Sequence, residues 1–213
     1  MLYYSLIDIS EVDESYVFTL CENIKRHFKD ISCFVRKESA CARMLLCDIL
    51  LKEYSEYDFL VDNEENGKPY IVNKKIFFNI SHSGNYVLCA FGDENVGCDV
   101  EIINTYNDKV VNRFFTVSEQ KVLNSSNKKD VDFTRLWTLK ESALKFTGSG
   151  VGGGLSSYDF SEYVQKDDFN AYGLNFKVIE SSDKIISICS QGNRILQRKA
   201  DTKDIFDEKG EKS

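Results

Sequence analysis

Residues 136–150 read LWTLKESALKFTGSG, a helical pattern that runs into glycines. Trp137, Glu141 and Lys145 follow one another at four-residue steps, so a helix places them on one face. An exposed Glu–Lys pair at this spacing stabilises a helix by only about 0.2–0.5 kcal/mol. The tryptophan on the same face indicates partial burial instead, and a buried glutamate needs a cation or a metal ion. We predict a helix over residues 132–147, anchored in the core by the tryptophan and ended by the first glycine.

The rest of the chain alternates helical and strand patterns. Apolar residues at helical spacing predict helices over 10–29 and 39–54, followed by a loop at 63–70. Period-two patterns then predict an antiparallel meander of three strands, over 75–81, 86–91 and 96–103. Further elements are a short helix near Ser118 and strands over 174–180 and 184–190.

The order of helices followed by strands therefore occurs twice. This order predicts an α+β fold with two α+β halves, residues 1–94 and 95–200. The remaining residues, 201–213, form a charged tail that we expect to fray.

The composition is ordinary for a globular chain of 213 residues, with 42% apolar and 29% charged residues. The net charge of −7 argues against nucleic-acid binding, because phosphate contacts require clustered basic residues. No run approaches the roughly 20 apolar residues of a membrane helix, and no basic start precedes an apolar core, so we expect no membrane association. Seven cysteines without a C-x-x-C pair predict buried, reduced thiols in a cytoplasmic protein.

Two acidic residues share one face of the strand expected in VGCDVEII, residues 96–103. Because side chains alternate along a strand, Asp99 and Glu101 point the same way. The common interpretation is a solvated face of an antiparallel sheet. The alternative is a cation site, because carboxylates about 4 Å apart repel by roughly 4 kcal/mol at an effective dielectric of about 20, and a divalent cation reverses that penalty. Few oxygen ligands, supplemented by water and a substrate phosphate, suit Mg²⁺.

Residues 79–85, NISHSGN, place Ser81 beside His82 at the end of a strand. Neighbouring strand residues point to opposite faces and no aspartate is placed to orient the histidine, which disfavours a hydrolase triad. With His27 as the only other histidine, a histidine-based zinc site is disfavoured too. A contact with a phosphate or hydroxyl group is the better use of Ser81 and His82.

Arg36 and Arg43 fall on one face of the second helical segment, away from its apolar stripe. A solvated helix surface is the simpler interpretation of that face. The glycines within 148–154 follow a helix and do not connect a strand to a helix N-terminus, so they match neither a P-loop nor a dinucleotide fingerprint. We interpret them as a flexible connection.

Four blocks occur together in a specific order: GKP at 67–69, NISHS at 79–83, VGCDVE at 96–101 and WTLKESALKFTGSG at 137–150. This order resembles the Sfp-type 4′-phosphopantetheinyl transferases, whose pattern is G-x-D-x-E followed by W-x-x-K-E-[AS]-x-x-K-x-x-G. The long motif matches at every defined position, and the resemblance spans residues 33–190.

The resemblance implies an enzyme that moves the 4′-phosphopantetheine arm of coenzyme A onto a serine of an apo acyl or peptidyl carrier protein, with Mg²⁺, releasing adenosine 3′,5′-bisphosphate. It implies a monomer of two similar α+β halves related by a pseudo-twofold, with coenzyme A in the cleft between them. Whether the carrier serves fatty acid, polyketide or nonribosomal peptide synthesis stays open.

The resemblance also implies roles for individual residues. The Mg²⁺ ligands would be Asp99, Glu101 and Glu141. Coenzyme A would contact Lys145 and Lys140 through its phosphates, Ser81 and His82 near the pyrophosphate or 3′-phosphate, Lys37 with Arg36 or Arg43 on the 3′-phosphate, and Lys68 by the adenine.

Catalysis needs phosphate charge neutralised and the serine deprotonated in line, so a metal, lysines and one carboxylate suffice. Glu141 is the candidate general base and Lys145 the candidate for stabilising the leaving group. Whether Glu141 is base, metal ligand or both stays open. The segment Val110–Phe115 is our expected docking site for the carrier.

Two other classes of function stay open. A non-catalytic module that binds coenzyme A or a nucleotide would keep the basic contacts but would have little use for three convergent carboxylates. A metal-dependent phosphohydrolase would use similar carboxylates with water as the nucleophile. Carrier modification separates both from a transferase.

Overall fold

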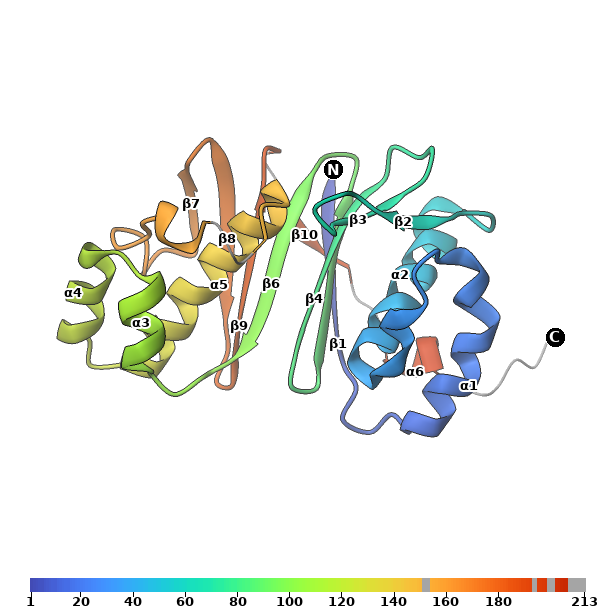
Figure 1. Cartoon of the computed structure of the whole chain (residues 1–213), viewed down its shortest axis with the longest axis horizontal. Helices are drawn as coiled ribbons and strands as arrows, with labels where there is room; N and C mark the ends of the chain where they lie inside the picture. The colour runs from blue at the N-terminus through green and yellow to red at the C-terminus, as the bar shows by residue number, and fades with distance from the viewer. Residues whose placement is uncertain (151–153, 193–194, 199–201, 207–213) are drawn as a thin grey trace.

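The computed structural model describes residues 1–150, 154–192, 195–198 and 202–206, and Figure 1 shows it as a ribbon. The first part of the chain forms β1 (Leu2–Asp8), α1 (Glu14–Ile24), 3₁₀ turns at Lys25–His27 and Ser32–Val35, α2 (Lys37–Tyr54), β2 (Val61–Asn63), β3 (Pro69–Ile71), β4 (Phe77–Ser83) and β5 (Tyr86–Gly92). The second part forms β6 (Val96–Ile102), α3 (Asp108–Phe114), α4 (Val117–Ser125), α5 (Lys129–Thr147), a 3₁₀ turn at Leu155–Ser157, β7 (Asp168–Ala171), β8 (Leu174–Glu180), β9 (Lys184–Ser190), β10 (Ile195–Gln197) and α6 (Thr202–Phe206).

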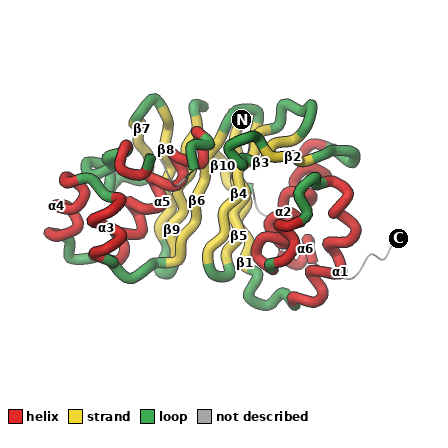
Figure 2. The backbone as a smooth tube through the Cα atoms, in the orientation of Figure 1, coloured by secondary structure: helices red, strands yellow, loops and turns green. Residues whose placement is uncertain are grey.

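Two four-stranded sheets stand side by side in the middle of the molecule, with helices at both ends (Figure 2). The strand orders are β10-β1-β5-β4 and β6-β9-β8-β7. The α+β class predicted from the sequence is confirmed, whereas the division at residues 94 and 95 stays a prediction. One strand crosses that division, because β10 pairs in parallel with β1 of the first sheet.

The predicted three-stranded meander is wrong at its third strand. β4 pairs with β5 in antiparallel register, but β6 pairs with β9, almost ninety residues later in the chain. β4 and β6 are therefore edge strands of different sheets that lie beside each other. We call this junction the seam.

Three apolar clusters hold these layers. The first lies between α1, α2 and the first sheet, and the second lies between α3, α4, α5 and the second sheet. The third joins the two sheets through residues such as Leu88, Ala90, Val100 and Ile188. Because fully burying one such aliphatic side chain contributes about 1.5–3 kcal/mol, this third cluster fixes the sheets against each other.

The helix α5 packs directly on β6, and Gly97 makes this approach possible. A Cβ at Gly97 would lie 2.0 Å from the carbonyl oxygen of Ser142 and 2.5 Å from the amide nitrogen of Phe146. The glycine two residues before Asp99 therefore sets how close the carboxylates of β6 come to the side chains of α5. Gly148 ends α5 at a φ of 72°, as predicted, while residues 151–153 of the expected glycine connection lie outside the described residues.

Several short elements were not expected from the sequence. They are β1, the β2–β3 hairpin around the predicted loop, α3 and β7. Within the expected frayed tail, Thr202–Phe206 form α6 and Phe206 is buried in the first cluster, while the other residues of that tail lie outside the described residues. Five of the cysteines, Cys21, Cys41, Cys89, Cys98 and Cys189, are buried as expected. Within the described ranges, we find no helix both long and apolar enough to span a bilayer.

Candidate functional site

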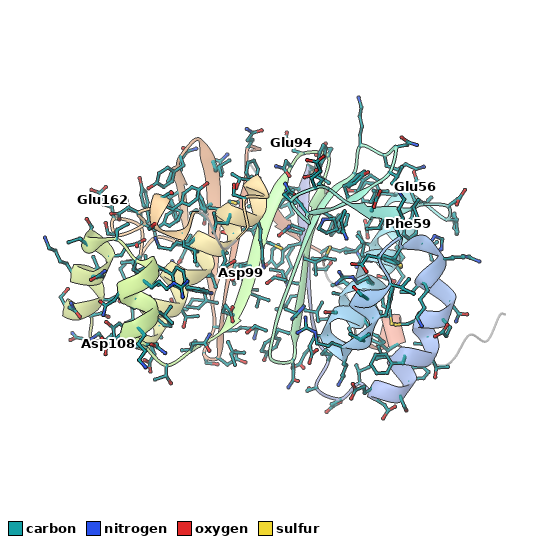
Figure 3. The ribbon with its side chains drawn as sticks, viewed as in Figure 1. Glu56, Phe59, Glu94, Asp99, Asp108 and Glu162 are labelled. Carbon is teal, nitrogen blue, oxygen red and sulfur yellow. The ribbon has the colours of Figure 1, made fainter. Side chains whose placement is uncertain are left out.

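The candidate site lies along the seam, where β6 of the second sheet meets β4 of the first and α5 packs on β6. Asp99 of β6 is near the middle of the molecule (Figure 3). Its side chain is buried, with a relative exposure of 3%. Its Oδ1 accepts hydrogen bonds from Ser81 Oγ at 2.7 Å and from Lys145 Nζ at 2.6 Å. The second oxygen, Oδ2, is buried without a hydrogen-bond partner.

Glu101 lies two residues further along β6, on the same face, as the strand pattern predicted. Its Oε2 accepts hydrogen bonds from Ser83 Oγ at 2.6 Å and from Asn104 Nδ2 at 3.5 Å. Burial raises the pKa of the Glu101 carboxyl, and nearby Asp99 raises it further against the opposing effect of Ser83. The interpretation of this face as solvated is therefore wrong, because α5 and β4 cover it.

Glu141 projects from α5 toward these two carboxylates. It is 8% exposed. Burial, with contributions from Asp99 and Glu101, raises the pKa of Glu141 to about 7, although Lys145 acts in the opposite direction. A carboxyl group with this pKa can take up and release a proton near neutral pH, which is what a general base requires.

Lys145 lies one helical turn after Glu141 and is the cation nearest to the carboxylates. Burial lowers its pKa, but Asp99, Cys98 and Glu141 together outweigh that effect and the net pKa of Lys145 is raised. The ammonium group stays charged at neutral pH and donates to Asp99 and to Ser81 Oγ, the latter at 2.8 Å. The predicted helix face of Trp137, Glu141 and Lys145 therefore points into the seam at its carboxylate end.

The arrangement suits a divalent cation in its donor chemistry. Among the residues that the structure describes, no three His, Cys, Asp or Glu side chains are close enough together to hold a metal ion as they stand. Lys145 instead neutralises Asp99. The buried, unpartnered Asp99 Oδ2 and the raised pKa values of Glu101 and Glu141 nevertheless mark a site with surplus negative charge, which a hard cation with oxygen ligands relieves.

A cleft of about 230 Å³ opens beside these groups, between the β3 turn of the first half and the C-terminal end of α5. Glu141 and Lys145 line one wall, and Lys68 and Asn79 line the other. Lys68 Nζ donates to Asn95 Oδ1 at 2.7 Å and to the carbonyl of Phe146 at 2.9 Å. These bonds tie the first half to the end of α5.

A basic face lies next to the seam at the start of α2. His82 faces this helix, and its Nε2 lies 3.5 Å from Ser39 Oγ. Burial lowers the pKa of His82, helped by Lys145 and by Arg36 and Arg43. Lys37 Nζ donates to the carbonyl of Ile9 at 2.8 Å, so it is partly engaged by the protein itself. Arg43 donates to the carbonyl of Ser39 at 3.3 Å, and Arg36 is exposed.

The structure contradicts the expected contact between Lys140 and the phosphates. Lys140 is fully buried on the other face of α5, because consecutive helical residues are rotated by about 100°. Its ammonium pairs with buried Glu119 at 2.8 Å and donates to the carbonyls of Leu155, at 2.8 Å, and Tyr158. Lys140 therefore fastens α4 and the segment after the glycines to α5.

The expected docking segment, Val110–Phe115, contributes side chains to the core. Val111 and Phe115 are 1% and 4% exposed and belong to the second apolar cluster. Phe114 and Phe115 pack against Trp137 at ring distances of 5.9 and 6.4 Å, which confirms the tryptophan as the anchor of α5. Val110 and Phe114 are only partly buried, so a carrier contact at this segment stays a prediction.

Sequence reasoning missed three polar residues of the site, namely Ser83, Asn104 and Asn95. Ser83 and Asn104 hydrogen-bond to Glu101, and Asn95 binds Lys68. The alternation of Asn79, Ser81 and Ser83 in NISHS was the available signal, because it puts three polar side chains on one strand face.

Comparison with known proteins gives a consistent result. The family model of the 4′-phosphopantetheinyl transferase superfamily matches residues 95–194. The chain is 31% identical over 158 residues to 4′-phosphopantetheinyl transferase psf-1 of Bacillus pumilus, covering 64% of this chain and 68% of that relative. It is 33% identical over 153 residues to 4′-phosphopantetheinyl transferase gsp of Aneurinibacillus migulanus, covering 67% and 63%. It is 34% identical over 135 residues to 4′-phosphopantetheinyl transferase Sfp of Bacillus subtilis (strain 168), covering 59% and 60%. The chain thus matches less than two thirds of the length of the second and third relatives and slightly more of the first.

Proposed function

This chain belongs to the 4′-phosphopantetheinyl transferase superfamily, and we propose on that basis that it transfers the 4′-phosphopantetheine arm of coenzyme A to a serine of an apo carrier protein. The observation that carries the proposal is the meeting of Asp99, Glu101, Glu141 and Lys145 at the seam. Asp99 and Glu101 belong to the G-x-D-x-E motif, and Glu141 and Lys145 belong to the long motif, whose other charged residue, Lys140, lies in the core.

The reaction exchanges one phosphorus–oxygen bond for another. The serine oxygen of the carrier forms a bond to the phosphorus that bears the pantetheine arm. The bond from that phosphorus to the adenosine 5′-phosphate oxygen breaks, which releases adenosine 3′,5′-bisphosphate. Glu141 accepts the serine proton, directly or through a water molecule. Lys145 lies one turn away and offsets negative charge that develops on the leaving group.

Asp99, Glu101 and Glu141 are the residues that would hold Mg²⁺. The ion, when bound, supplies positive charge for the pyrophosphate oxygens. The chain's own contribution is to bury Asp99 and Glu141 and to keep Glu101 partly buried beside them, which limits the access of bulk water to these carboxylates.

The basic face supplies contacts for the rest of coenzyme A. Arg36, Lys37, Arg43 and His82 surround the start of α2, where backbone N–H groups also favour anions, and we assign the 3′-phosphate to them. Lys68 lies at the rim of the cleft and is assigned to the adenine end. Both halves of the cleft come from one chain, so a cytoplasmic monomer suffices for the reaction.

The direct test is a mass measurement on a panel of apo acyl and peptidyl carrier proteins. Each carrier is incubated with coenzyme A and Mg²⁺, with and without the protein. We expect an added mass of one phosphopantetheine on at least one carrier, and the panel reports the pathway. Loss of coenzyme A without any carrier would indicate a phosphohydrolase, and binding without turnover would indicate a non-catalytic module.

Two variants separate the roles of the carboxylates. Glu141→Gln keeps the side-chain shape and removes the base, so a full rate at saturating Mg²⁺ would rule out the base role. Asp99→Ala removes a proposed ligand, so metal-dependent activity in that variant would rule out the ligand role.

A further inference from the structure

Side-chain oxygens of β4 accept the hydrogen bonds of β6 amides that backbone carbonyls of a neighbouring strand would otherwise accept. The amides of Cys98, Val100 and Ile102 donate to Asn79 Oδ1 at 3.0 Å, Ser81 Oγ at 3.3 Å and Ser83 Oγ at 3.3 Å, respectively. β4 and β6 are edge strands of different sheets, so no backbone ladder between them serves these amides. Unpaired N–H groups are costly when buried, and the polar residues of NISHS prevent that cost.

The hydrogen-bond capacity of the Ser81 hydroxyl is fully used. A serine hydroxyl has one proton to donate and two lone pairs that accept. The lone pairs accept from the amide of Val100 and from Lys145 Nζ, and both of these groups can only donate. The single proton is therefore directed to Asp99 Oδ1, at 2.7 Å. With all three positions occupied, the hydroxyl has no proton left for a phosphate.

Ser83 repeats this arrangement two residues later. It accepts from the amide of Ile102 and donates to Glu101 Oε2 at 2.6 Å. Each hydroxyl thus accepts a hydrogen bond from the amide of one β6 residue and donates one to the carboxylate of the residue before it. In each carboxylate, one oxygen is held by a serine hydroxyl. The second oxygen of Asp99, Oδ2, is buried without a hydrogen-bond partner.

We propose that Ser81 and Ser83 are positioning residues that aim Asp99 and Glu101 at a divalent cation. This role replaces the expected direct contact of Ser81 with coenzyme A phosphates. The proposal rests on the proposed transferase function and adds Ser83, together with a new role for Ser81. Asn79 belongs to the same row but reaches only the backbone, so it sets the strand spacing without holding a carboxylate.

The test measures cation binding apart from turnover. Mn²⁺, a divalent ion that carboxylate sites also accept, is titrated into the protein with coenzyme A present and no carrier, and free Mn²⁺ is followed by its electron paramagnetic resonance signal. The proteins are the wild type, Ser81→Ala, Ser83→Ala, Ser83→Thr and the control Ser187→Ala. Ser187 is also a buried serine, opposite Asp99 in the β6–β9 ladder, but its hydroxyl is hydrogen-bonded to that of Ser142.

We expect Ser81→Ala and Ser83→Ala to weaken Mn²⁺ binding by about 10–100-fold, the usual effect of removing a partner of a metal-binding carboxylate. Ser83→Thr keeps the hydroxyl and should restore binding to near the wild-type value, and Ser187→Ala should leave it near that value too. Thermal unfolding of each variant identifies loss of folding, and Ser83, which is only partly buried, keeps the test valid if Ser81→Ala fails to fold.

Unchanged Mn²⁺ affinity in the folded Ser83→Ala variant would overturn the positioning role while leaving the transferase function intact. The same conclusion follows if Ser81→Ala raises only the KM for coenzyme A, because that result indicates a direct phosphate contact. A wild-type protein that modifies no carrier in the mass measurement would overturn the function itself, and with it the inference.

Discussion

Replacing Glu141 by Gln should make the protein more stable at alkaline pH in the absence of metal. The pKa of Glu141 is raised from 4.5 to about 7, first by burial. The folded state therefore holds the Glu141 proton more tightly than the unfolded chain, and the stability of the wild type falls as pH rises between about 4.5 and about 7. At about 1.36 kcal/mol for each unit of pKa, the difference corresponds to about 3 kcal/mol.

Glutamine is uncharged at every pH, so Glu141→Gln lacks this loss. The free energy of unfolding of Glu141→Gln minus that of the wild type should increase by about 2–3 kcal/mol from pH 5 to pH 8. Urea unfolding in EDTA at a series of pH values measures it, and the change with pH removes any constant offset from the substitution. Glu162→Gln is the control at an exposed position, far from the seam (Figure 3). A difference between wild type and Glu141→Gln that stays constant across this pH range would refute the reasoning.

Three further substitutions test the packing behind the site. Lys140→Met leaves buried Glu119 without its cation and should lower the free energy of unfolding by about 3–5 kcal/mol in urea, with exposed Lys121→Met as a near-neutral control. Gly97→Ala forces α5 away from β6 and should lower it by about 3 kcal/mol and weaken carrier modification, whereas at Gly154 the new methyl meets only the end of Leu144 and should do less. Arg198→Met removes ion pairs to Asp48 and Glu53 and should lower the melting temperature. An unchanged melting temperature would show that these ion pairs do not stabilise the fold.

The sequence alone was sufficient where a local period determines the answer. The strand period put Asp99 and Glu101 on one face, and the helical period put Glu141 and Lys145 on another. These rules hold whatever the rest of the chain does, because they follow from the geometry of one element. The glycine that ends α5 was predictable for the same reason, since a left-handed residue after a helix favours glycine.

The sequence pattern could not predict which strands become neighbours. β6 follows β5 after a short turn, yet it pairs with β9, because an edge strand can pair with any strand whose apolar face and register fit. Short strands such as β2 and β3, of three residues each, carry too few residues for a clear period. Their place depends on partners far away in the chain.

The direction of a single charged side chain was also decided only by the tertiary structure. The helical period puts Lys140 on the row of apolar Leu136 and Leu144, but it does not indicate that Lys140 meets Glu119 there. Nor does it indicate that the adjacent Glu141 enters the seam. Likewise, Ser81 became a partner of Asp99 only when β4 and β6 met as edges of different sheets. The sequence by itself determined which groups share a face, and long-range packing determined what each face meets, because the free energy of burial depends on the whole set of neighbours.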